Sequence, residues 1–327
     1  MAETKTPAKA PKTAKLARRN KWTRDDTELT ILALPTSIWF ALFCYLPMFG
    51  VILAFKDYRI AGDSGFLGSL LKSEWVGFKN FEYFFGLRDF PRILRNTILY
   101  NLVFIVLDIV LPVALAIMIS NIYSKRSSKF YQTLMFMPHF MSWVVVSYFV
   151  YAFLVGDKGL LNQVIRAFGG EGPNWYSEPE YWPAILVIMH VWKALGYSMV
   201  VYLASITGID TSLYEAAVLD GASKFQQARY ITLPSLQPMI IMMFILAVGR
   251  IFSSDFGLFY QVTRGANQPL TPYVATFDVK IFQMLTNGNV SLAKTTAASL
   301  FQSVIGCITI LTANGIVRKL DKSSALI

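Results

Sequence analysis

The sequence predicts an all-α polytopic membrane protein with six transmembrane helices, and two observations lead to this prediction. Only 15% of the 327 residues are charged and 54% are hydrophobic, whereas soluble domains carry about 25% charged residues. The apolar residues also gather into long runs that can cross a hydrocarbon core of about 30 Å. Both observations argue against an ordinary soluble enzyme.

The apolar runs define a membrane domain over residues 29–317. Residues 1–28 are rich in Lys, Ala, Pro and Thr, so we expect a disordered, basic cytoplasmic tail there. A second, short cytoplasmic tail is expected at residues 318–327. The six predicted spans are Leu29 to Phe55, Asn96 to Ile122, Tyr131 to Val155, Trp182 to Ile206, Leu236 to Ser253 and Ala297 to Val317.

The distribution of positive charge predicts the orientation. Six spans put both termini on one side, and that side carries 16 Lys and Arg residues against 12 on the opposite side, although the opposite loops are longer. Lys and Arg accumulate in cytoplasmic loops, so we expect cytoplasmic termini. The net charge of +10 is then explained by topology, and no soluble module remains to bind nucleic acid.

Three long outer segments are expected to be ordered and to offer a docking surface. They are residues 56–95, 156–181 and 254–294. Their Trp, Tyr, Gly and Pro content is typical of ordered loops and interfacial helices. In the second segment, apolar residues from Leu160 to Phe168 recur at helical spacing before a Gly pair, which predicts a short amphipathic helix.

The predicted cytoplasmic loop at residues 207–235 has the pattern helix, turn, helix, membrane. Ser212 and Glu215 have the spacing of a capping box, Gly221 marks a turn, and Pro234 marks the restart into the fifth span. A short apolar helix at the membrane surface has little to bury within its own chain. A groove on a partner protein is a natural place for it.

Seven positions of this loop, within 20 residues, resemble the EAA motif of bacterial ABC importer permeases. They are Glu215, Ala216, Ala217, Gly221, Ile231, Leu233 and Pro234. Flanking segments between Pro47 and Pro234, including LPMFGVILAFKDYRI, WVGFKNFEYFF and MPHFMSWVVVSYFVYAFL, resemble the carbohydrate-type permeases, in particular the LplB-like branch that serves oligosaccharides and polysaccharide fragments. This resemblance implies a type I ABC importer permease fold in a bacterial inner membrane.

The resemblance also implies partners. A permease of this kind forms a heterodimer with a second homologous permease, above two ATPase subunits and below an extracytoplasmic substrate-binding protein. The sequence has no GxxxxGK[ST] phosphate-binding loop, so ATP and Mg are expected on the ATPase subunits and no cofactor on this chain. ATP-driven closure of the ATPases would move the EAA helix as a lever and alternate the access of the cavity.

The motif assigns a coupling role residue by residue. Small side chains let helices approach closely, Gly221 supplies a bend, and Glu215 could pair with a basic residue of the ATPase. The positions that match are Glu215, Ala216, Ala217, Asp220, Gly221, Ala222, Ile231, Leu233 and Pro234.

Candidate pathway residues are the charges inside the spans, because such charges usually face a cavity or one another. These are Asp108, Lys193, Arg250 and Asp255. A cationic lining would suit a uronate-bearing oligosaccharide, whereas mutual ion pairing is the competing interpretation. Aromatic faces that could stack on sugar rings are Trp143, Trp192 and Tyr197, although packing is the usual role of such residues.

Other functional classes find little support. His139 and His190 are too few for a metal site and are expected to be satisfied membrane-helix histidines. The sequence has no persuasive catalytic set for a membrane enzyme, and a proton-coupled carrier gives no reason for the EAA loop. The main alternative is an ABC permease for another solute, such as a peptide, an amino acid or a polyamine.

Overall fold

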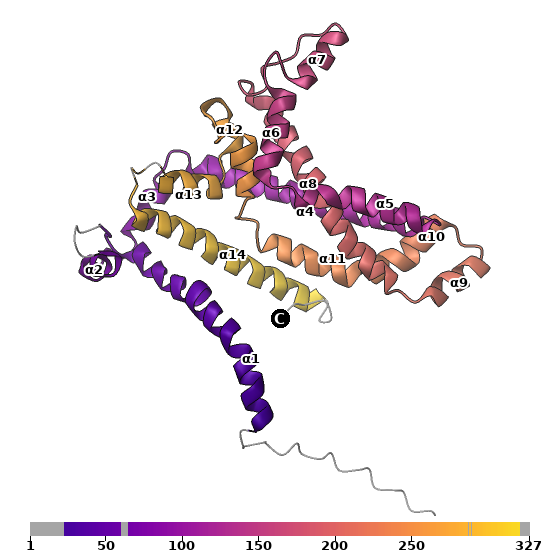
Figure 1. The fold of residues 1–327 in the computed structure, drawn as a ribbon, viewed down its shortest axis with the longest axis horizontal. Coiled ribbons are helices and arrows are strands. Elements are labelled where there is room, and N and C mark those ends of the chain that lie inside the picture. Colours follow the sequence, from indigo (N-terminus) through magenta and orange to yellow (C-terminus); the bar gives the residue numbers. More distant parts are fainter. Residues whose placement is uncertain (1–22, 60–64, 287, 289, 321–327) are drawn as a thin grey trace, which may run out of the picture. The chain divides into compact units, whose positions relative to one another are not determined.

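A computed structural model describes residues 23–59, 65–286, 288 and 290–320. Most of both expected tails, at 1–28 and 318–327, lies outside these residues. Within them the chain is helical, with no strand and one isolated bridge between Lys56 and Trp75. The chain divides into two compact units, Met1–Gly50 and Val51–Ile327 (Figure 1).

The first unit is dominated by helix α1, Arg24–Phe40, which is followed by a π-helical turn at Ala41–Tyr45 and a 3-10 helix at Leu46–Phe55. Thr23 begins α1 because its side chain accepts a hydrogen bond from the backbone of Asp26. No residue of α1 is buried within this chain.

The second unit is built around α4, Phe90–Ser120, and α8, Trp182–Thr207, which lie side by side (Figure 1). One core cluster joins them near Phe104 and Leu186, and a second near Ala116 and Met199. Helices α11, Leu233–Val248, and α14, Leu292–Leu320, also pack together. Burial of apolar side chains between these helices fixes the positions of the helices that carry the polar side chains.

The third predicted span is broken. Helix α5, Lys125–Phe136, with the 3-10 turn at Met137–Phe140, meets α6, Trp143–Leu154, at an angle of 97°. The prediction of one continuous helix from Tyr131 to Val155 is therefore wrong. The chain is extended at Met141, and Ser142 begins a new helix by accepting a hydrogen bond from the backbone of Val145.

The candidate membrane spans otherwise agree with the sequence prediction. Among the described residues, five helices are long and apolar enough to cross a membrane, or six if the bent pair forms one span. The five are Arg24–Phe55, Phe90–Ser120, Pro179–Thr207, Lys224–Val248 and Leu292–Lys319. Each overlaps one predicted run, although the helix of the fifth run begins at Lys224 and not at Leu236.

Short helices lie in the segments between the spans. They are α2 (Gly65–Lys72), α3 (Lys79–Phe85), α7 (Leu160–Ala167), α12 (Thr271–Val274) and α13 (Phe277–Thr286). The predicted helix before the Gly pair is confirmed as α7. The buried Asn162 side chain orders this region, because its amide donates to the carbonyls of Gly156 and Pro173 and accepts from Trp175.

Burial changes the titration of one tyrosine of this region. The hydroxyl of Tyr176 donates to the carbonyl of Val262 over 3.3 Å. Desolvation raises the pKa of Tyr176 to about 12, against the attraction of Arg264. The hydroxyl therefore stays a neutral donor that ties the segment after α7 to the segment before α12.

Candidate functional site

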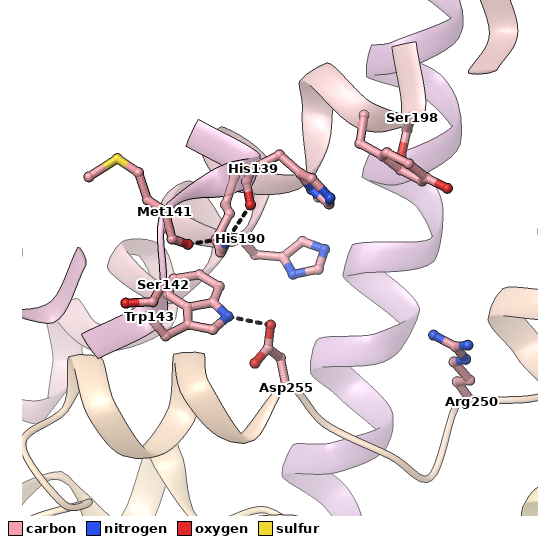
Figure 2. Close-up of a pocket in the computed structure, with 11 residues that line it drawn as sticks. His139, Met141, Ser142, Trp143, His190, Ser198, Arg250 and Asp255 are labelled. Atoms are coloured by element: carbon pink, nitrogen blue, oxygen red, sulfur yellow. Dashed lines mark hydrogen bonds between the residues drawn. The ribbon is translucent and has the colours of Figure 1, made fainter. Parts of the chain in front are cut away.

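A polar cavity of about 560 Å³ lies where the broken span meets α8 (Figure 2). Its lining residues are His139, Met141, Ser142, Trp143, His190, Lys193, Ala194, Tyr197, Ser198, Arg250 and Asp255. A neighbouring cavity of about 610 Å³ shares His190, Tyr197 and Arg250 and adds Asp108. The structure thus brings together six of the seven residues that the sequence singled out as pathway candidates.

Lys193 is bound to the break of the third span. Its ammonium donates to the carbonyl of His139 over 2.9 Å and to that of Met141 over 2.7 Å, and it lies 5.3 Å from the centre of the Trp143 ring. The extended backbone at the break leaves these carbonyls without helical donors, and Lys193 supplies them. The ammonium group of Lys193 is thus hydrogen-bonded to the backbone.

Asp255 joins two further parts of the wall. Its carboxylate accepts the indole N–H of Trp143 over 2.6 Å and caps the turn at Gly257–Val262 by accepting from the backbone of Gly257 over 2.9 Å (Figure 2). Gly257 is required here, because a Cβ at this position would lie 2.1 Å from the Trp143 ring. These contacts fix the Trp143 ring at the cavity.

Asp108 pairs with His190. The carboxylate lies 2.9 Å from the imidazole Nε2, and the imidazole stacks on Phe104 with a ring separation of 3.7 Å. His139 stacks on Tyr197 at 4.8 Å. The expectation that membrane-helix histidines find partners is consistent with these contacts, but their position on the cavity was missed.

Arg250 differs from the other charges of the cavity. Within the described residues, its guanidinium has neither a hydrogen bond nor an ion pair, although it lines both polar cavities. Figure 2 shows it apart from the bonded pair of Trp143 and Asp255. The competing interpretation, an ion pair between intramembrane charges, therefore does not apply to Arg250.

Trp192 lies elsewhere. It lines a third cavity of about 620 Å³ whose other walls are apolar side chains of α6, α7 and α8, such as Phe149 and Ile188. The residues that sequence reasoning missed, including His190 and Ser198, share one face of α8 with Lys193. Helical spacing from Lys193 could have found them.

The loop at residues 207–235 has the predicted order of elements. Helix α9, Thr211–Leu219, is followed by a turn in which Gly221 has φ +77°, then by α10, Lys224–Gln227, a π-helical turn at Ala228–Thr232 and α11. Carbonyls at the end of α9 are satisfied by this turn, since the backbone of Ala222 donates to Ala217 over 2.8 Å. The prediction of helix, turn and helix is confirmed.

The predicted capping box is wrong. Asp210 caps α9, since its carboxylate accepts from the backbone of Ser212 over 3.0 Å, and this hydrogen bond holds the pKa of Asp210 below its usual value. A true capping box begins α10 instead, between Ser223 and Gln226. Within the described part of the chain, the carboxylate of Glu215 has no partner.

Helix α9 leaves its apolar side chains uncovered by this chain. None of its residues is buried, and Val218 and Leu219 are 58% and 89% exposed. One side-chain hydrogen bond, of 2.8 Å between the hydroxyls of Tyr214 and Thr232, ties it to the following segment. The exposed apolar side chains of α9 thus have no cover within the described part of the chain.

Comparison with known proteins decides the family. Residues 108–322 match the family described as the binding-protein-dependent transport system inner membrane component. The chain belongs to this permease family. The permease is 35% identical to Protein LplB of Bacillus subtilis (strain 168) over 93% of its own length and 91% of that relative.

Further matches agree. The permease is 35% identical to the polygalacturonan/rhamnogalacturonan transport system permease protein YteP of the same organism, over 89% of this chain and 88% of that one. It also resembles a solved chain of a bacterial ABC transporter involved in the import of the acidic polysaccharide alginate, with a TM-score of 0.79, 31% identity and coverage of 90% and 96%. The family resemblance and the all-α permease fold are thereby confirmed, and the permease is a transport subunit, not an enzyme.

Proposed function

We propose that this permease forms half of the translocation pathway for an acidic, uronate-containing oligosaccharide. The observation that carries the proposal is the unpaired Arg250 guanidinium, which lines a cavity beside the ring of Trp143. A planar guanidinium binds carboxylates through two parallel hydrogen bonds. Aromatic rings offer apolar faces to the C–H faces of sugars.

Two relatives support an acidic sugar. The name of one includes polygalacturonan, and a solved structure of similar fold is a transporter with an alginate pentasaccharide-bound periplasmic protein. By the same relationship, we assign to this permease a second homologous permease, two ATPase subunits that bind ATP and Mg, and an extracytoplasmic binding protein.

The coupling loop is assigned to the ATPase side. Helix α9 presents the apolar Val218 and Leu219 to a groove of the ATPase, and the free carboxylate of Glu215 pairs with a basic residue there. The motif positions Ala216, Ala217, Asp220, Ala222, Ile231, Leu233 and Pro234 shape this surface. The loop is then cytoplasmic, as are both termini.

A different solute is the alternative. A polyamine fits poorly, because Arg250 has no carboxylate partner among the described residues and would repel a polycation. A peptide or an amino acid could offer a carboxylate to Arg250, so these solutes must be compared directly with oligosaccharides.

Reconstituted uptake tests the proposal. The permease, its partner subunits and candidate loaded binding proteins are assembled in liposomes, and ATP-dependent uptake is measured for uronate oligosaccharides, neutral oligosaccharides and peptides. Arg250→Met should lower uronate uptake about tenfold, the loss of one charge-assisted contact. Arg92→Met, in an exposed pair with Asp89 outside the cavities, is the control. Equal uptake of uronates by the Arg250 variant, or stimulation by peptides alone, would contradict the proposal.

A further inference from the structure

A third polar cavity, of about 480 Å³, lies beside α13 and α14. Its volume is within the range of small-molecule sites, roughly 300–1,000 Å³. Ser253 lines both this cavity and the neighbouring cavity that contains Arg250. The two cavities therefore adjoin at the segment that follows α11.

Asp278 provides an acceptor with free capacity. One carboxylate oxygen accepts from the backbone of Ser254 over 2.6 Å and from its hydroxyl over 2.9 Å, and the amide of Gln302 donates to both oxygens, over 3.1 Å and 3.3 Å. No cation pairs with Asp278 in the described part of the chain. In the described part of the chain the second oxygen accepts only the 3.3 Å contact from Gln302, and each carboxylate oxygen has about two lone-pair sites, so this oxygen can still accept a hydroxyl donor from a ligand.

Aromatic side chains form an apolar part of the wall of this cavity. Phe256 and Phe282 both line the cavity, with ring centres 4.6 Å apart. Phe256 also stacks on Tyr260 at 4.8 Å and 16°. These mutual contacts hold the rings in place, so a ligand that stacks on them loses little further side-chain freedom.

We infer that this cavity is a second sugar subsite, specific for an uncharged, hydroxyl-rich unit of the same oligosaccharide whose uronate reaches Arg250. The inference rests on the proposed function. The aromatic pair faces the ring carbons of the sugar, and Asp278 accepts its hydroxyls. The negative charge of Asp278 repels a second uronate carboxylate at this position. The cargo is therefore a mixed oligosaccharide, in which a neutral unit accompanies the uronate.

A larger side chain that fills the cavity tests the subsite, because its effect should depend on the length of the oligosaccharide. In the complete reconstituted importer, Ser303→Leu should lower uptake of a mixed pentasaccharide about fivefold, the loss of roughly one sugar–aromatic contact. Uptake of a uronate disaccharide, which occupies only the Arg250 cavity, should change less than about twofold. Ser37→Leu is the control, because Ser37 and Ser303 are both exposed and both donate to the carbonyl four residues earlier.

The charge of Asp278 is tested separately. Asp278→Asn keeps the side-chain size and should raise uptake of an all-uronate pentasaccharide relative to the mixed one. Equal losses for both chain lengths in Ser303→Leu, no loss for either, or an unchanged preference in Asp278→Asn would overturn the subsite. Failure of the proposed function is distinct, since Arg250→Met would then leave uptake of both chain lengths intact.

Discussion

Two cations of the cavity, Lys193 and Arg250, are alike in sequence and different in structure. Both are isolated positive charges in apolar runs, and that rarity is what made them predictable. Their partners were not predictable, because the carbonyls that Lys193 binds lie more than 50 residues earlier in the chain. His190 was missed for a related reason, since its partner Asp108 is 82 residues away in the chain.

Stability should separate the two cations. Lys193→Met leaves the carbonyls of His139 and Met141 without their donor, so we expect the unfolding free energy to fall by about 2 kcal/mol and the melting temperature in detergent by about 5 °C. Arg250→Met should change the melting temperature by less than about 1 °C, because no partner is lost. A melting temperature lowered equally in both variants would contradict this distinction.

Gly221 should be essential for coupling and dispensable for insertion. Its φ of +77° is strained for any side chain, although a Cβ there would touch nothing within 4 Å. Gly221→Val should therefore cost about 1–2 kcal/mol locally, disrupt the end of α9 and abolish transport. Gly208→Val is the control, since Gly208 has φ −85°. Undiminished uptake in the Gly221 variant would count against the loop as a coupling element.

At the level of helices, the hydropathy pattern located the spans but could not reveal the break in the third one. Met141 and Ser142 lie inside an apolar run, and their effect depends on a donor from α8. The helix, turn and helix of the coupling loop were predictable, because Gly221 and Pro234 act locally. The choice of cap was not, since Asp210 and Ser212 both satisfy the N-cap preference.

Close approach of α5 and α8 depends on one glycine. A Cβ at Gly196 would lie 1.9 Å from the carbonyl oxygen of Met135, so these helices must separate to admit any side chain. Gly196→Ala should lower the unfolding free energy by about 2–3 kcal/mol. Gly208→Ala, whose Cβ would lie 3.5 Å from its nearest neighbour, should change it little. Thermal unfolding in detergent measures both, and equal stability would show that the helices adjust without cost.

For the whole molecule, the proposed topology requires the α9–α10 loop and the α4–α5 loop on one face of the membrane and α7 on the other. Figure 1 shows α9 and α10 at the end of α8 remote from α7. Positive charge alone gave a modest bias toward this orientation, because much of it comes from the N-terminal tail. The orientation of the chain can be measured directly at exposed positions.

Labelling of single-cysteine variants tests this topology and the proposed docking surface together. After Cys44 and Cys307 are replaced by serine, Leu219→Cys and Tyr123→Cys should react with an impermeant maleimide only in inside-out vesicles, and Phe168→Cys only in right-side-out vesicles. The three native side chains are 89%, 103% and 89% exposed, so each thiol is accessible to the reagent. Reaction of Leu219→Cys and Phe168→Cys from the same side would refute the topology.

Assembly adds a second comparison on the same variants. Binding of the ATPase subunits should slow labelling of Leu219→Cys, because α9 is then covered, and should leave Tyr123→Cys unchanged if the α4–α5 loop stays outside the contact. If the ATPases bind and Leu219→Cys still reacts at its free rate, the exposed apolar face of α9 is not where they dock, and the coupling role must move to another part of the loop.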